Sequence, residues 1–132
     1  MKRMFLSILA CSLFLLGAAP GALAQQKERT PEEIASQEAE RLETLLGLEG
    51  WQVFYVDSIL QNNYSHMQAE LYGLRDSKVE NVDLYVSVRD KWNQLTYDAF
   101  SKVFNEDQWN RYLKSGAGKE MKLRQKRAAK AK

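Results

Sequence analysis

Apolar residues recur every three or four positions along most of the chain after residue 30, a spacing that places them on one face of an α-helix. The segments with this spacing predict helices over about 31–46, 50–72, 78–102 and 106–115. The β-branched run 82–88 lies inside a longer helical repeat, so we assign it to a helix rather than a strand. The sequence therefore predicts an all-α fold.

The two middle segments each carry two apolar stripes instead of one. In segment 50–72, one stripe contains Val53, Val56, Leu60, Tyr64, Met67 and Leu71, and a weaker one on the opposite side contains Trp51, Tyr55, Ile59, His66 and Ala69. In segment 78–102 and the residue after it, one face holds Tyr85, Val88, Trp92, Leu95, Ala99 and Val103, and the other holds Val79, Val82, Val86, Tyr97 and Phe100. Such stripes form either a core or dimer seam, or a surface that binds a partner. The candidates for a partner-binding surface are Trp51, Tyr55, Ile59, Tyr97 and Phe100.

Capping signals mark where the predicted helices begin. In a capping box, the N-cap side chain accepts a hydrogen bond from the N3 amide, and a Glu or Gln at N3 accepts one from the N-cap amide. Thr30-Pro31-Glu32-Glu33, Ser77-Lys78-Val79-Glu80 and Asn105-Glu106-Asp107-Gln108 fit this pattern, whereas Glu49-Gly50-Trp51-Gln52 fits only half because Glu is a poor N-cap. Gly47 suits the left-handed residue after a helix end. Both 46–52 and 103–109 are therefore predicted to be rigid corners between helices.

The first 24 residues have the pattern of a secretory signal peptide. Two basic residues precede an apolar run over residues 5–16, and Ala22-Leu23-Ala24 follows as a small-x-small cleavage site. The alternatives are a membrane anchor, for which the run is short, and lipid attachment at Cys11. Cleavage near Ala24 predicts a periplasmic or secreted protein without cysteine, consisting of a helical domain (25–115) and a tail (116–132).

Charge divides this chain into an acidic body and a basic tail. Residues 25–113 hold nine basic and 16 acidic side chains, a net charge of −7, whereas residues 114–132 hold eight basic and one acidic, a net charge of +7. The segment 116–118 is predicted to be a flexible joint, and the tail to be either a fifth helix or disordered. Its charged residues are Lys119, Lys122, Arg124, Lys126, Arg127, Lys130 and Lys132.

The tail is a candidate for contact with an anionic surface. Exposed ion pairs contribute only about 0–1 kcal/mol each, so we expect it to reach outward rather than to dock on its own body. Because aromatic residues do not alternate with its basic ones, we expect no specific nucleic-acid partner.

Residue patterns typical of catalysis are not found in this sequence. His66 is the only histidine, and Glu70 is its one acidic neighbour at helical spacing, which is too few ligands for a metal site. The carboxylate pairs Glu32-Glu33 and Glu106-Asp107 fall in first helical turns, where they complement the helix dipole. We therefore expect a non-enzymatic protein with no cofactor and no catalytic, metal-binding or cofactor-binding residues.

The two corners carry a resemblance to a known family. Residues 46–52, Leu-Gly-Leu-Glu-Gly-Trp-Gln, resemble the L-x-L-T-x-x-Q form of the LTxxQ motif, and residues 104–108, Phe-Asn-Glu-Asp-Gln, resemble its second copy with Phe for Leu and Asn for Thr. Two such motifs in a small, signal-bearing, all-helical chain look like the Spy/CpxP family of periplasmic proteins. Carried over by position, the motif residues are Leu46, Leu48, Glu49, Gln52, Phe104, Asn105 and Gln108. Glu49 departs from the family pattern, which has a capping Thr at that position.

The resemblance covers roughly residues 30–114. It implies a thin, elongated four-helix hairpin or cradle, usually an antiparallel homodimer, here followed by the basic C-terminal tail. It further implies an ATP-independent chaperone that binds unfolded or envelope proteins, or an adaptor that inhibits an envelope-stress sensor. The family's metal-binding branch is disfavoured because the mature chain has one His and no Cys. The alternative function is a structural or interaction subunit of the cell envelope that docks through its basic tail.

Overall fold

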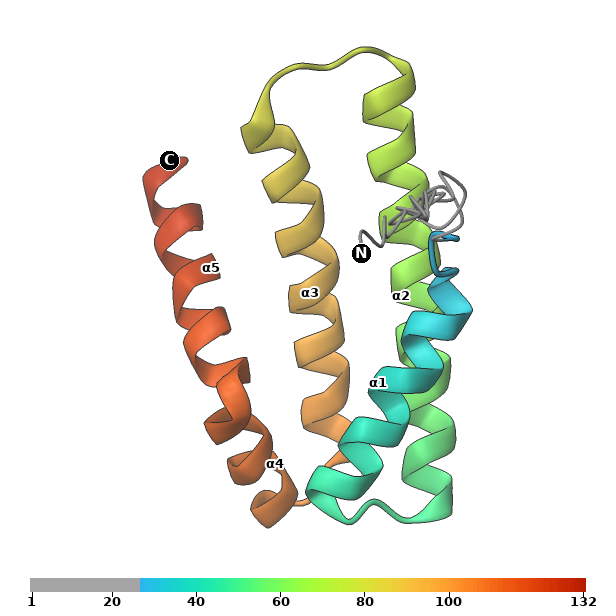
Figure 1. Cartoon of the computed structure of the whole chain (residues 1–132). Coiled ribbons are helices and arrows are strands. Elements are labelled where there is room, and N and C mark those ends of the chain that lie inside the picture. Colours follow the sequence, from blue (N-terminus) through green and yellow to red (C-terminus); the bar gives the residue numbers. More distant parts are fainter. Residues whose placement is uncertain (1–26) are drawn as a thin grey trace, which may run out of the picture.

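The structure, a computed structural model, describes residues 27–132; the predicted signal peptide lies outside these residues. In the described part of the chain every regular element is a helix (Figure 1). These are α1 (Pro31–Leu46), α2 (Gly50–Asp76), α3 (Val82–Val103), α4 (Glu106–Tyr112), the π-helical turn η1 (Leu113–Ala117) and α5 (Gly118–Lys130). The predicted all-α fold is confirmed.

Three helices lie side by side, with α3 between α2 and α5, and α1 packs along the half of α2 that begins the helix (Figure 1). The turn from α1 to α2 and the turn from α3 to α4 lie at the same end of the molecule. The two corners predicted from the sequence therefore meet in space.

The hydrophobic core lies at this end of the bundle. Its most deeply buried large side chains are Phe100, Leu42, Leu46, Leu60 and Val56, and the full set adds Ala35, Ala39, Leu48 and Phe104. Full burial of one such aliphatic or aromatic side chain stabilises the fold by about 1.5–3 kcal/mol. No described residue of α2 after Asn63, or of α3 before Thr96, is buried. The α2–α3 hairpin therefore projects beyond the core, and the Asn63–Thr96 hydrogen bond of 2.9 Å marks where the core ends.

The tip of this hairpin corrects one capping prediction. Ser77 does not begin a helix: its N–H donates to the carbonyl of Gly73, and Lys78 takes a left-handed conformation with φ of 55°. The predicted box at residues 77–80 was wrong because these residues close α2 instead. Asn81 is the actual N-cap of α3, and its side chain accepts a hydrogen bond from the Asp83 amide at 3.0 Å.

The predicted joint at residues 116–118 is a kink between helices. The fourth helix ends at Tyr112 rather than at 115, the π-helical turn follows, and Gly116 has a φ of 119°. Of the two states left open for the tail, a fifth helix and disorder, the structure shows the helix.

The prediction that the tail reaches outward was wrong. Arg127 makes two hydrogen bonds to the carboxylate of Asp90 on α3, at 2.7 and 2.8 Å, and Arg124 donates to Gln94 at 3.1 Å. The two arginines are three positions apart on α5, and their partners are four positions apart on α3. Helical periodicity therefore places both arginines on one face, opposite both partners. A single exposed ion pair contributes little to stability, but here the tail makes two aligned contacts with α3.

Candidate functional site

Two buried glutamines join the corners. Gln52 Nε2 donates to Gln108 Oε1 at 2.7 Å, and Gln108 Nε2 donates back to Gln52 Oε1 at 3.1 Å. Each amide group also donates to the backbone of the opposite corner, Gln52 to the carbonyl of Val103 at 3.0 Å and Gln108 to that of Gly47 at 3.4 Å. The side chains are only 4% and 5% exposed, so these partners replace the water that burial removes.

The same glutamines complete the capping of their own helices. Gln52 Oε1 accepts the N–H of Glu49 at 2.9 Å, and Gln108 Oε1 accepts the N–H of Asn105 at 3.0 Å. Asn105 closes its box by accepting the Gln108 amide at 2.8 Å. The Glu49 carboxylate also accepts the indole N–H of Trp51 at 2.6 Å, which gives the glutamate at the N-cap position a partner. The predicted box at Asn105 is present, and Glu49 and Gln52 also form a capping box at the start of α2.

The remaining motif residues form the apolar side of the corners. Leu46 is fully buried, and Leu48 and Phe104 are 8% and 7% exposed. Gly47 has the predicted left-handed conformation, with φ of 62°. The Phe104 ring lies 6.5 Å from that of Trp109, as expected for a hydrophobic staple at the start of α4.

Arg111 is a corner residue that sequence reasoning missed. Its guanidinium donates to the carbonyls of Leu45 and Leu46, at 3.1 and 2.9 Å, and to Asp107 at 3.0 Å. The last turn of α1 contains no basic residue of its own, so α4 supplies the cation that favours a helix C-terminus. The four-residue spacing of Asp107 and Arg111 could have predicted their ion pair. The contact with α1 depends on the tertiary fold.

Open hollows lie on the surface of the described chain, at the corners and beside two helix pairs. A depression of about 470 Å³ opens between the corners, next to Glu49, Trp51 and Arg111. A groove of about 500 Å³ lies between the first part of α1 and the α2–α3 hairpin, and a cleft of about 730 Å³ separates α3 from α5. The last of these shows that α5 is not packed against α3 along its length.

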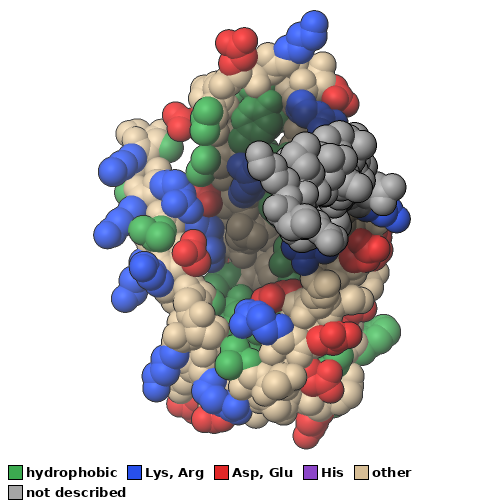
Figure 2. Space-filling model, viewed as in Figure 1, with side chains coloured by type: hydrophobic (Ala, Val, Ile, Leu, Met, Phe, Trp, Pro, Cys, Tyr) green, Lys and Arg blue, Asp and Glu red, His purple; other side chains and the backbone are tan. Residues whose placement is uncertain are grey.

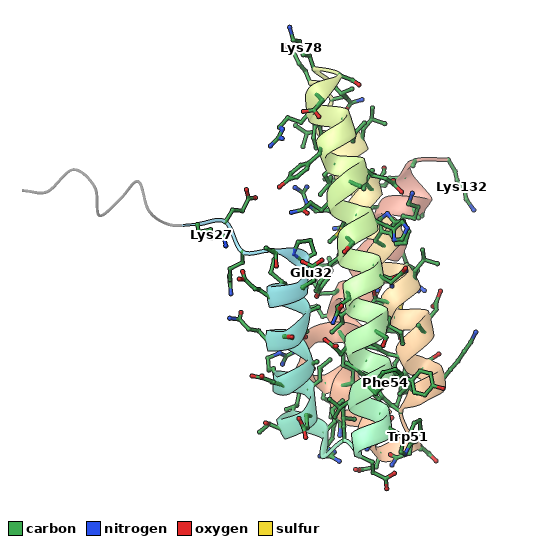
Figure 3. All side chains as sticks on the ribbon, turned by 90° about the vertical axis from the view of Figure 1, so that its right-hand side faces the viewer. Lys27, Glu32, Trp51, Phe54, Lys78 and Lys132 are labelled. Atoms are coloured by element: carbon green, nitrogen blue, oxygen red, sulfur yellow. The ribbon has the colours of Figure 1, made fainter. Side chains whose placement is uncertain are left out.

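Three aromatic side chains project from the start of α2, and we call them the aromatic patch: Trp51, Phe54 and Tyr55. They are 53%, 68% and 52% exposed. The ring of Tyr55 lies edge-on to the other two, with centroid distances of 6.2 Å to Trp51 and 5.8 Å to Phe54. Figure 3 shows Trp51 and Phe54 on the side of α2 away from α1. Sequence reasoning missed Phe54 because it belongs to neither apolar stripe.

The other candidates for a partner-binding surface lie elsewhere. Ile59 is half-buried against the hydrophobic core. Phe100 belongs to that core and is only 1% exposed, so the prediction that Phe100 faces a partner was wrong. The reason is that α4 folds back and places Tyr112 edge-on to Phe100, with ring centroids 5.6 Å apart. Tyr97 is half-buried under Trp109, at 4.9 Å, and faces α4 and α5.

Basic side chains gather along α5 (Figure 2). Lys119, Lys122 and Lys126 are exposed, and none of them forms an ion pair within residues 27–132. The two arginines differ: Arg124 lies 5.6 Å from the centre of the Tyr97 ring, and Arg127 is paired on α3. The hydrogen-bonded carboxylate of Asp90 raises the pKa of Arg127. Lys130 and Lys132 are also exposed.

Two tyrosines near the core have altered acidity. Burial raises the pKa of Tyr112 to about 12, and the nearby Glu38 carboxylate adds to the effect. Burial and Glu38 also raise the pKa of Tyr64. Both hydroxyls therefore stay protonated throughout the physiological range.

His66 has a structural environment on the α2–α3 hairpin. Its ring stacks on Trp92 with centroids 5.2 Å apart, and its Nδ1 donates to the carbonyl of Asn62 at 2.7 Å. Nearby, Glu70 accepts hydrogen bonds from Lys91 at 2.6 Å and from the Trp92 indole at 3.0 Å. The bond from Lys91 lowers the pKa of Glu70. These contacts join α2 to α3 beyond the core.

Within residues 27–132, no group of three or more His, Cys, Asp and Glu side chains is placed to hold a metal ion. No helix of this part of the chain combines the length and apolar character needed to cross a membrane. No family model, curated protein or solved structure matches the chain.

Proposed function

We propose that the protein is a non-enzymatic, periplasmic binding protein of the Spy/CpxP type, acting as an ATP-independent chaperone or an envelope-stress adaptor. The observation that carries the proposal is the aromatic patch, whose three large side chains are each more than half exposed. Adjacent exposed apolar side chains of this size are typical of interaction surfaces.

The chemistry of the patch suits an apolar segment of an unfolded or envelope protein. Trp51 and Tyr55 combine a broad apolar ring with a polar group, which allows contact with varied sequences. The Glu49 carboxylate bonded to Trp51 and the exposed Ser58 give the patch a polar edge. The Gln52–Gln108 pair fixes the start of α2, so the patch projects from a rigid support.

Aggregation of a chemically reduced test protein, such as α-lactalbumin, tests this proposal without nucleotide. The wild-type protein should suppress light scattering, and a double variant, Phe54→Ser with Tyr55→Ser, should lose most of the effect. Val82→Ser is the matched control, because Val82 is 69% exposed at the far end of the α2–α3 hairpin. Equal suppression by the double variant and the control would rule out the patch as the binding surface.

The basic helix favours a second candidate function, a structural or interaction subunit that docks on the cell envelope. Lys119, Lys122, Lys126 and Lys130 leave four positively charged lysines exposed on α5. Co-sedimentation with phosphatidylcholine vesicles, with and without phosphatidylglycerol, tests this role. Replacing these four lysines by Gln should greatly lower retention on anionic vesicles at low salt. Retention of that variant equal to wild type would exclude docking through α5.

A further inference from the structure

Helix α5 is attached to the bundle differently from α4. The segment before the π-helical turn is anchored: Gln108 is buried, and Trp109 and Tyr112 pack against the core. By contrast, no residue of α5 is buried, and none belongs to the hydrophobic core cluster. Helix α5 therefore contributes no side chain to the hydrophobic core.

Polar contacts hold α5 against α3. Arg127 and Asp90 form a two-bond ion pair whose side chains are 43% and 23% exposed, and Arg124 donates to Gln94. The cleft of about 730 Å³ lies between the same two helices, lined by Val86, Ser87 and Ala128 among others. Water and dissolved ions can reach this ion pair, so salt screens it.

A kink directly follows Tyr112, the last residue that packs against the core. The chain leaves Tyr112 through the π-helical turn, where Gly116 takes a φ of 119° that side chains rarely adopt. At Gly118 an added Cβ would lie 3.1 Å from the carbonyl oxygen of Leu113, so this position also favours glycine. Two glycines thus place a kink between an anchored helix and an unanchored one.

We propose that α5 is a hinged latch, closed by the Arg127–Asp90 pair, which opens about Gly116 and uncovers the face of α3 beneath it. That face carries Val86 and Tyr97, both half-buried in the closed state. Opening also frees the two arginines to join the exposed lysines of α5 in one cationic surface. An anionic partner that competes for Arg127 therefore favours the open state. This motion does not depend on the binding activity of the aromatic patch.

Energy transfer between dyes on α2 and α5 measures the latch in the full chain. Ala69→Cys and Ala129→Cys place the dyes at exposed positions, and Cys11→Ser removes the native thiol. The screening length falls from about 10 Å at 0.1 M salt to about 3 Å at 1 M. At low salt we expect a narrow distribution of transfer efficiencies with a high mean. In 1 M sodium chloride the mean should fall and the distribution should broaden.

Variants at the ion pair identify its role. Asp90→Asn should give the low, broad transfer already at low salt, and the charge swap Asp90→Arg with Arg127→Asp should restore the high value. Asp76→Asn is the control, since Asp76 pairs weakly with Arg75 at the hairpin tip, 3.7 Å away. Transfer that is unchanged by salt, or an Asp90→Asn protein that behaves as wild type, overturns the latch. If circular dichroism shows that Asp90→Asn is unfolded, the salt titration of the wild type and the transfer efficiency of the swap variant test the latch instead.

Discussion

The side-chain amides of Gln52 and Gln108 hydrogen-bond to each other in both directions, at 2.7 and 3.1 Å, although 56 positions separate them in the sequence. Each amide oxygen also accepts the N-cap N–H of its own helix. The starts of α2 and α4 are therefore held by one shared group of hydrogen bonds. Loss of either glutamine affects both corners.

The first prediction concerns this coupling. Gln52→Ala and Gln108→Ala should each lower the free energy of unfolding by about 2 kcal/mol, because each leaves the other buried amide without a partner. The double variant should lose less than the sum, by on the order of 1 kcal/mol, as expected for residues in one network. Urea denaturation of the wild type, the two single variants and the double variant measures this coupling. Additive losses would show that the two capping boxes act independently.

The second prediction concerns Arg111. Replacement by Gln should lower stability by about 1 kcal/mol, because the C-terminal carbonyls of α1 lose a cationic donor. Asp107→Asn is the matched control: it leaves the contact of Arg111 with α1 in place, removes the exposed ion pair and one carboxylate in the first turn of α4, and should change stability by less than about 0.5 kcal/mol. Equal losses in the two variants would mean that the ion pair, not the contact with α1, is what stabilises the fold.

Sequence patterns predicted the elements whose signals are local. The bounds of α1 follow from Thr30 and Pro31 at its start and Gly47 at its end, and the structure confirms them. The start of α3 was misplaced because Ser77 and Asn81 are both suitable N-caps, and the choice depends on how α2 ends. The two glutamines were identified as caps, but their mutual contact arises only when the corners meet.

Surface assignments from the sequence were less successful, for a physical reason. A helical stripe shows that a face is apolar but not which neighbour covers it. Phe100 is covered by α4, whereas Phe54 lies outside both stripes and is the most exposed member of the aromatic patch. The placement of α5 likewise depended on the alignment of two arginines with α3, which becomes visible only when both helices are positioned.

The third prediction concerns alkaline pH. The pKa of Tyr112 is raised from 10 to about 12, so its contribution to stability is complete below pH 10 and is lost as the pH rises through 12. Tyr112→Phe should remove this part of the pH dependence, on the order of 2 kcal/mol. Urea denaturation across this range measures it, and tyrosinate absorbance should show one late-titrating group missing from the variant. An unchanged pH dependence in Tyr112→Phe would contradict the assignment.

The fourth prediction is that the protein forms a homodimer. On α3, Leu84 and Leu95 are each 45% exposed within the described chain. Sedimentation at about 10 micromolar, a range suited to a weak interface, should show a dimer. Leu84→Ser with Leu95→Ser should shift the protein to monomer, whereas Leu45→Ser on α1, 38% exposed, should not. A stable wild-type monomer at this concentration would exclude a dimer of the expected strength.

Photocrosslinking from Phe54 tests the proposed binding function most directly. A benzoylphenylalanine at this position, 68% exposed in the aromatic patch, can react with any chain that contacts the patch, and the same probe at Val82, 69% exposed, samples the far end of the α2–α3 hairpin. With a chemically unfolded test protein and no nucleotide, we expect crosslinks from position 54, few from position 82, and loss of those at 54 once the test protein has folded. Equal crosslinking from both positions, or none from position 54, would contradict a binding function centred on the aromatic patch.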